Sequence, residues 1–312
     1  MRREPAGRRG SSPAVGPGSW LVALPAWGDR CARVCADPVL PALARALEAL
    51  GRPARVLLYT DSAELPARAS ELLGDLAEVL PRPVPVRDRS FASMSAAHQD
   101  AMDRAGHGER VLLLTADMVL SREVLTACEA RISGGMRFVG CAAMRALEGA
   151  GAPIGAPGRE LLAWAWANRH PMTRECTWPD GRSYDLWRMY FERDGEVAAR
   201  VFLPHPLAVV PAGRSIHFYP TVDVNLHLCF AQSEVGLITS PDEGAAVELS
   251  PPDKEFLTTE TMRARFERGG PSLPTLGPIT NNRHRMFWGK KVVLCGAGGD
   301  CGDAELVERM LG

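Results

Sequence analysis

The sequence predicts an α/β protein in which a mostly parallel sheet continues into a mixed sheet. Between residues 19 and 145, short apolar runs alternate five times with segments of helical spacing. This alternation is typical of a parallel sheet with helices on both faces. After residue 145 the alternation stops, and strand signals joined by short turns take its place. The two patterns together predict a layered first half and a mixed-sheet second half.

The elements of the first half follow from their apolar patterns. Residues 39–50 carry apolar side chains at helical spacing, and Gly51 is placed to end that helix as a C-cap. Prolines within residues 79–86 put that strand near an edge of the sheet. Strands are expected at residues 20–24, 54–61, 79–86, 111–114 and 137–141, and further helices at residues 63–76, 91–105 and 122–132.

The second half contains a hairpin and several short strands. Asp194-Gly195 is a hairpin turn signal between two apolar segments. Strands are expected at residues 186–191, 197–203, 207–210, 216–219 and 235–239, and helices at residues 161–169 and 258–268. Residues 246–250 end at Pro251-Pro252, and residues 291–294 are a last apolar run.

Composition excludes several classes of protein. A net charge of −1 gives no basic field, so no nucleic-acid partner is expected. The eight cysteines form no C-x-x-C pair, which argues against structural zinc and fits a reducing, cytoplasmic location. No apolar run approaches the roughly 20 residues that span a bilayer, so neither a transmembrane segment nor a signal peptide is expected.

The most informative stretch is the buried strand at residues 111–114 and the turn Thr115-Ala116-Asp117 after it. Ligands of open α/β sheets bind beyond the carboxyl ends of the strands, so Asp117 is placed to hold a cation or a sugar hydroxyl. The alternative is a loop or helix-capping acid. Ser121 is expected to cap the next helix, which leaves Asp117 for another role. Pro25, Asp61 and Asp117 end three strands and are expected to face one crevice.

Common catalytic motifs are missing from the sequence. It contains no G-x-x-x-x-G-K-[ST] phosphate loop, no G-x-S-x-G hydrolase elbow and no H-E-x-x-H zinc motif. The glycine-rich stretch at residues 296–301 has too little chain after it for a βαβ dinucleotide site.

Acids at strand ends remain as the main chemical signal. They suit a nucleotide-diphosphate sugar, because a divalent cation held by carboxylates neutralises the diphosphate and another carboxylate can act as a base. Asp61 and Asp223 are candidates for these roles, with turn or loop acids as the alternative reading. His98, His205 and His284 are each either packed histidines or ligands.

Six stretches, taken in order, resemble bacterial proteins of the GT-A type, the nucleotide-sugar glycosyltransferase fold. The resemblance covers most of residues 20–255 and depends on the order and spacing of the stretches. They are Leu24-Pro25-Ala26-Trp27-Gly28, Leu57-Leu58-Tyr59-Thr60-Asp61, residues 113–121 around Asp117, Phe202-Leu203-Pro204-His205-Pro206-Leu207, Thr221-Val222-Asp223, and Glu248-Leu249-Ser250-Pro251-Pro252-Asp253.

This resemblance implies one continuous GT-A-like domain. Residues 19–145 would be a Rossmann-like nucleotide-binding half, and residues 146–312 an acceptor-binding half with a C-terminal extension. Residues 1–18, which are rich in Arg, Gly, Ser and Pro, are expected from their composition to be a disordered tail. It implies transfer of a sugar from a nucleotide-diphosphate donor to a hydroxyl or amine of a small-molecule or glycan acceptor, assisted by Mn²⁺ or Mg²⁺.

Site residues follow from the same resemblance. Asp223 would serve acceptor-side catalysis, and His284 would join Asp117 at the metal. The usual D-x-D motif is reduced here to Thr115-Ala116-Asp117, so its first acid is missing. The residues expected to bind the nucleotide are Pro25, Trp27, Thr60, Asp61, His98 and Asp117.

Two other functions stay open. The first is a nucleotidyltransferase that builds the sugar nucleotide, although its triphosphate loop is normally glycine-rich and residues 24–30 hold one glycine. The second is an inactive GT-A-like protein that binds nucleotide sugars as a scaffold, which the reduced D-x-D motif would explain.

Overall fold

The computed structural model describes residues 18–85, 90–175, 177–178, 188–193, 196–201, 203–211, 216, 222–253, 287, 290 and 292–295. Within these ranges the chain is mixed α/β, and its strands form three sheets of seven, four and three strands. The tail predicted for residues 1–18 lies outside the described residues except for Gly18, as do the helix expected at residues 258–268 and the turn Asp194-Gly195.

The seven-stranded sheet has the order β12-β6-β11-β4-β1-β2-β3 and is mostly parallel, as predicted. Only β11 runs antiparallel to its neighbours among these strands. The six residues of β1 are all buried, because sheet neighbours and helices enclose the strand on every side. The strands are β1 (Trp20–Pro25), β2 (Ala54–Tyr59), β3 (Ala77–Arg82), β4 (Arg110–Leu113), β6 (Phe138–Cys141), β11 (His205–Val209) and β12 (Val235–Ile238).

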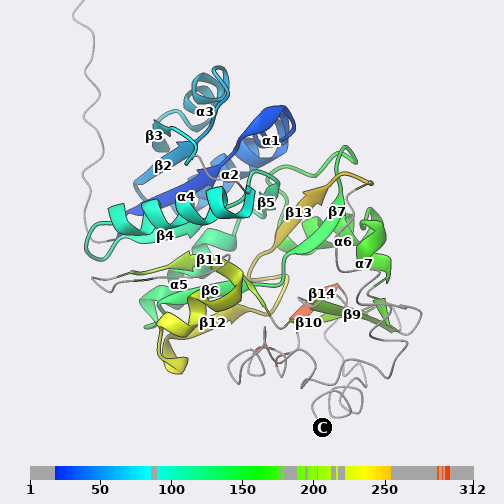
Figure 1. Cartoon of the computed structure of the whole chain (residues 1–312). Coiled ribbons are helices and arrows are strands. Elements are labelled where there is room, and N and C mark those ends of the chain that lie inside the picture. Colours follow the sequence, from blue (N-terminus) through cyan, green and yellow to red (C-terminus); the bar gives the residue numbers. More distant parts are fainter. Residues whose placement is uncertain are drawn as a thin grey trace, which may run out of the picture.

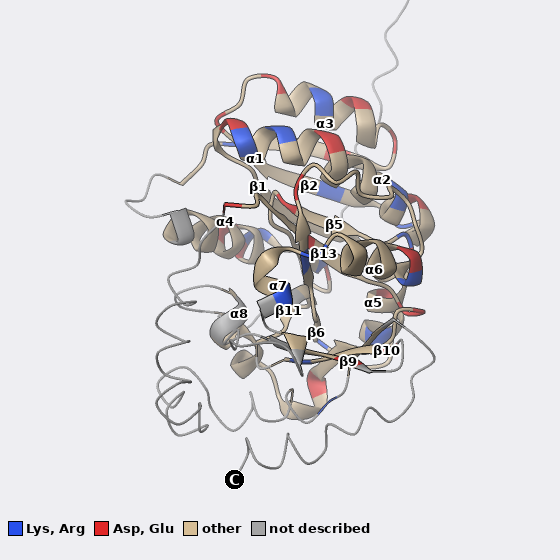
Figure 2. Ribbon diagram, turned by 90° about the vertical axis from the view of Figure 1, so that its right-hand side faces the viewer, with Lys and Arg blue, Asp and Glu red and all other residues tan. Residues whose placement is uncertain are grey.

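Helices cover both faces of this sheet. Figure 2 shows α4 on one side of the strands and α2 and α5 on the other. The predicted edge position of β3 is confirmed, since β3 ends the strand order (Figure 1). The helices of this layer are α1 (Gly28–Val34), η1 (Cys35–Val39), α2 (Leu40–Leu50), α3 (Leu65–Leu73), α4 (Ser90–Arg104) and α5 (Val124–Ser133).

The first helical segment is longer than its apolar pattern indicates. It starts at Gly28 and passes through the π-helical turn η1 into α2. Pro38 lies inside η1, and a proline removes an i→i−4 hydrogen bond, so a local widening accommodates it. The predicted end is confirmed: Gly51 is left-handed at φ 60° and donates its N–H to the carbonyl of Leu47.

Two smaller sheets complete the second half. The strands β5 (Met118–Leu120), β13 (Ala246–Ser250) and β7 (Met144–Leu147) form one sheet, in the order β5-β13-β7. The other has the order β14-β10-β9-β8, from β14 (Val292–Cys295), β10 (Glu196–Val201), β9 (Arg188–Arg193) and β8 (Thr177–Trp178). Helical segments here are α6 (Gly158–Ala167), α7 (Pro171–Glu175), α8 (Val222–Asn225), η2 (Leu226–Cys229) and η3 (Gln232–Glu234).

Two details differ from the sequence-based expectations. Residues 118–120 were expected in a connection and instead form β5, which pairs antiparallel with β13. The cap predicted for Ser121 is wrong. Its hydroxyl accepts the N–H of Ala245 at 2.9 Å, and its own N–H donates to the carbonyl of Ala245, so Ser121 joins the ends of β5 and β13.

The described residues contain no helix that is both long and apolar enough to cross a membrane.

Candidate functional site

The direction of strand addition reverses at β1. From β1 the sheet grows through β2 to β3, and the chain then returns past β1 to place β4 on its other side. All four strands are parallel, so their carboxyl ends lie at one edge of the sheet. The strand order therefore reverses between β1 and β4, and such a switch point is where open α/β sheets bind ligands. We call the residues that follow β1, β2 and β4 the strand-end site.

Hydrogen bonds tie together the loops after β1 and β2. Asp61, which is exposed, accepts the N–H of Gly28 on Oδ1 at 2.9 Å. Thr60 Oγ1 accepts the N–H of Ser62 at 3.1 Å. Pro25 lies buried at the end of β1 in register with Tyr59, and Trp27 is half-buried beyond it. Four predicted nucleotide-binding residues, Pro25, Trp27, Thr60 and Asp61, are therefore brought to the same edge of the sheet.

Asp117 lies half-buried in the turn between β4 and β5. Thr115 donates its hydroxyl to Asp117 Oδ1 at 2.8 Å. The backbone carbonyl of Asp117 accepts the N–H of Leu249 in β13 at 2.7 Å. The acid predicted at the end of this strand is thus held from two sides, by its own turn and by a strand of the second half.

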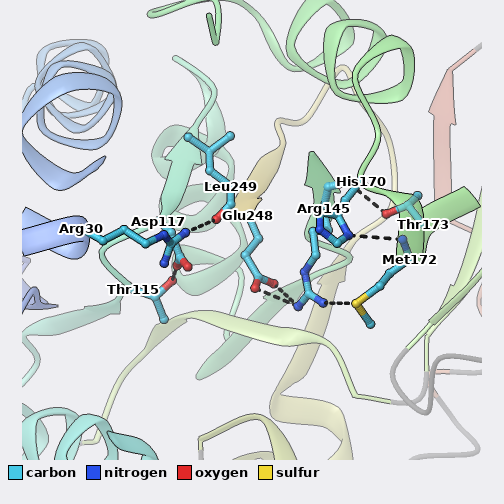
Figure 3. A network of polar contacts seen from close by, with 9 residues as sticks. All are labelled: Arg30, Thr115, Asp117, Arg145, His170, Met172, Thr173, Glu248 and Leu249. Atoms are coloured by element: carbon cyan, nitrogen blue, oxygen red, sulfur yellow. Dashed lines mark hydrogen bonds and ion pairs between the residues drawn. The ribbon is translucent and has the colours of Figure 1, made fainter. Parts of the chain in front are cut away.

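Arg30 was not predicted as a site residue, yet it lies beside Asp117 (Figure 3). Its Nε donates to Glu148 Oε2 at 2.7 Å, and its Nη2 lies 2.6 Å from the same oxygen in the ion pair. Nη2 also donates to the carbonyl of Leu249 at 3.2 Å. Burial acts to lower the pKa of Arg30, but Glu148 and then Asp117 outweigh burial, and the pKa is raised. Arg30 is therefore a fixed positive charge at the strand-end site.

A second ion pair borders Asp117 on the side of the second half. Arg145 Nη2 donates to both carboxylate oxygens of Glu248 at 2.8 Å, and Nη1 contacts the sulfur of Met172 at 3.6 Å (Figure 3). His170 Nε2 donates to the carbonyl of Pro251 at 2.9 Å, and Thr173 Oγ1 donates to the carbonyl of Arg145. These bonds fix α7 against β7 and β13. The motif around Glu248 was the signal in the sequence for this pair.

The structure corrects the role expected for His98. Its side chain is fully buried, and Nε2 donates to the carbonyl of Leu114 at 2.8 Å. Burial lowers the pKa of His98 to about 4, helped by the neighbouring His205, so the ring is neutral at pH 7. His98 therefore supports the end of β4 from behind and presents no surface to a nucleotide. His205 has a similar place, with Nε2 3.2 Å from the carbonyl of Leu113.

Two predicted residues lack described side chains. Asp223 lies in α8, which packs against β11, but its side chain is not described. His284 lies outside the described residues altogether. Their roles in catalysis and metal binding stay predictions.

The described donor set at Asp117 does not fit Mn²⁺ or Mg²⁺. No group of three or more His, Cys, Asp or Glu side chains in the described ranges is arranged to hold an ion. Hard cations of this kind need several oxygen ligands, and Asp117 supplies one carboxylate that already accepts the Thr115 hydroxyl. The guanidinium of Arg30 beside it would also repel a dication.

No protein-family model and no curated protein sequence matches the chain. Among solved structures, TarS 1-349 of S. aureus in complex with UDP-GlcNAc is 16% identical, covering 43% of this chain and 37% of that one at a TM-score of 0.32. The chain spans 23% of the longer TarS structure. Mannosyltransferase PcManGT from Pyrobaculum calidifontis, in complex with GDP-Man and Mn2+, is 15% identical, covering 85% of this chain and 70% of that one at a TM-score of 0.42. These likenesses are weak.

Proposed function

We propose that the protein is a GT-A-type glycosyltransferase that moves a sugar from a nucleotide-diphosphate donor to a hydroxyl or amine of a small-molecule or glycan acceptor. The observation that carries this proposal is the switch point at β1. There Asp61 and Asp117 flank the place where a parallel sheet of this order binds ligands. Both acids belong to loops that hydrogen bonds hold in place.

The donor would lie across the strand-end site. Pro25, Trp27, Thr60 and Asp61 would line the base and ribose, since carboxylate and hydroxyl oxygens accept the ribose hydroxyls and a half-buried indole offers a stacking surface. Asp117 would face the diphosphate end of the donor and the sugar attached to it.

The acceptor would approach from the second half. β13 reaches Asp117 through Leu249, and β11 lies next to β4, so strands of residues 146–312 adjoin the donor side. This arrangement supports the division of one continuous domain into residues 19–145 for the donor and 146–312 for the acceptor. Asp223 is our candidate for the acceptor-side base, because its helix α8 packs against β11.

Specific contacts bear on the alternatives. The loop after β1 has one glycine, Gly28, and Asp61 accepts its N–H. This loop therefore lacks the glycine-rich backbone that would bind the triphosphate of a nucleotidyltransferase. Thr115 in place of the first D-x-D acid favours the second alternative, an inactive protein that binds nucleotide sugars. We also propose a cytoplasmic location, where thiols such as those of Cys35 and Cys128 would stay reduced.

The test is a thermal-shift screen with UDP, GDP, dTDP and CDP, each with EDTA or with Mn²⁺, followed by an assay for release of the nucleoside diphosphate from its sugar donor. A diphosphate at 100 times its Kd should add about 2.7 kcal/mol to the free energy of unfolding. With the matching nucleotide sugar in place of the diphosphate, Asp117→Ala should lose part of this gain, because Asp117 would face the sugar hydroxyls. Asp75→Ala should keep it, because Asp75 is exposed just before β3, at the opposite edge of the sheet.

The outcomes separate the candidates. Binding with release of diphosphate supports the transferase. Binding without release, across a panel of acceptors, supports the inactive binding protein. Absence of any stabilising diphosphate would rule out both.

A further inference from the structure

We propose that Arg30 binds the diphosphate of the donor directly and takes the place of a divalent metal ion at the strand-end site. This inference rests on the proposed function and adds to it the group that recognises the phosphates. Arg30 follows β1 at the switch point, on α1, and its side chain reaches the turn that holds Asp117 (Figure 3).

The backbone of Leu249 fixes the relative position of the two residues. Its N–H donates to the carbonyl of Asp117 at 2.7 Å, and its own carbonyl accepts a bond from Arg30 Nη2 at 3.2 Å. One residue of β13 therefore contacts both Arg30 and Asp117. A ligand at the end of β4 would therefore be near both the guanidinium and the carboxylate (Figure 3).

The guanidinium is held rigidly and still has donors to offer. Nε donates to Glu148, and Nη2 forms the ion pair with Glu148 and donates to the carbonyl of Leu249. Nη1 has no hydrogen-bond partner within the described part of the chain, and the Arg30 side chain is 32% exposed. Arginine is well suited to phosphate, because its planar group presents several N–H donors and keeps its charge. Glu148 is then the positioning residue that aims Nη1.

The pair of charges fits the two chemical parts of a nucleotide sugar. A phosphate oxygen would accept from Arg30 Nη1, while neutral hydroxyls of the sugar would donate to Asp117. The hydroxyl of Thr115 and the charge of Arg30 offset the negative charge of Asp117, which reduces its repulsion of the phosphates. A second acid at position 115 would do the opposite, so Thr115 is consistent with phosphate binding without a metal ion.

The experiment compares a nucleoside diphosphate with its nucleoside, using UDP against uridine and GDP against guanosine, by isothermal titration calorimetry in EDTA. Arg30→Gln should weaken binding of the diphosphate roughly 10- to 100-fold, the loss of a charge-assisted hydrogen bond, and leave the nucleoside unchanged. Arg30→Lys, which keeps the charge and the fold but loses the planar fork, should fall between. Arg33→Gln is the matched control, since Arg33 is exposed one turn further along the same helix.

The experiment distinguishes failure of this inference from failure of the proposed function. If Arg30→Gln and Arg30→Lys bind the diphosphate as the wild type does, the inference is wrong and the proposed function stands. The same holds if the wild type needs Mn²⁺ to bind the diphosphate while the nucleoside binds in EDTA. If neither nucleoside nor diphosphate binds to the wild type under any condition, the proposed function fails and the inference with it.

Discussion

The hydroxyl of Thr115 donates to Asp117 Oδ1 across 2.8 Å, inside the turn that follows β4. Position 115 is where the D-x-D pattern would place its first acid. The protein therefore has a hydroxyl that donates a hydrogen bond where a second carboxylate would be expected. The bond orients the Asp117 carboxylate, which lies beside the Arg30 guanidinium. The chemistry of this turn therefore favours one fixed carboxylate over a pair that shares a cation.

Removing the Thr115 hydroxyl should loosen Asp117 and weaken donor binding. Thr115→Val keeps the shape of the side chain and deletes the hydroxyl, and we expect the Kd for the nucleotide sugar to rise about tenfold. Thr115→Ser retains the hydroxyl and should bind within about twofold of the wild type. Calorimetric titration of the nucleotide sugar into both variants and the wild type measures these Kd values. Equal Kd values for Thr115→Val and the wild type would contradict the prediction.

His98 should make the protein less stable as the pH falls. Its pKa is about 4 in the folded protein against an ordinary value of 6.5, because burial disfavours the charged ring. Between those values the unfolded chain binds a proton that the folded protein does not, so the free energy of unfolding falls by on the order of 3 kcal/mol from pH 6.5 to pH 4.

His98→Gln keeps an N–H for the carbonyl of Leu114 without a group that titrates in this range. Urea unfolding of both proteins from pH 7 to pH 4 measures the effect as the difference between their curves. The wild type should lose more stability than the variant over this range. Parallel curves would show that His98 does not titrate as described.

Removal of the buried Glu109 carboxylate should destabilise the protein strongly. Its carboxylate is 1% exposed and accepts from Arg55 at 2.9 Å, from the N–H of Gly106 at 2.8 Å and from Ser19 at 3.3 Å. Glu109→Ala leaves these buried and partly buried donors without this acceptor and should cost about 3–5 kcal/mol.

The matched control for Glu109 is Glu48→Ala. Glu48 pairs with Arg45, and both side chains are about 60% exposed, so its loss should cost under about 1 kcal/mol. Urea midpoints compared at equal m-values report both changes. Similar shifts for the two variants would mean that burial of the Glu109 pair does not matter.

Gly244 should not accept a side chain. Its φ is +136°, and an added Cβ would lie 2.6 Å from Cα of Val124, a backbone atom at the start of α5. Gly135 also has a positive φ, of +99°, but a Cβ there meets nothing within 4 Å. Both alanine variants carry backbone strain of about 1 kcal/mol, and only Gly244→Ala adds overpacking of about 1–3 kcal/mol. Thermal melts should rank them in that order, and equal melting temperatures would refute the clash.

Local patterns determined much of the first half. Continuous apolar runs predicted β1, β2, β4 and β6, and Gly51 ended α2 as expected, because burial on both faces and a left-handed cap each depend on a few neighbouring residues. Met118–Leu120 was missed as β5 because three residues carry no pattern. They form a strand through pairing with β13, far along the sequence. The antiparallel β11 between β4 and β6 is likewise a long-range choice.

The sequence by itself also determined that acids close the strands after Tyr59 and Leu113, since an apolar run that stops at an aspartate is a local feature. Only the tertiary structure decided what those acids meet. Asp61 accepts the N–H of Gly28, and Asp117 lies near Arg30. Glu148 orients Arg30 by accepting its Nε–H. The reason is physical: periodicity records which face of an element is buried, whereas the partner of a charged side chain is set by packing between elements that are distant in the chain.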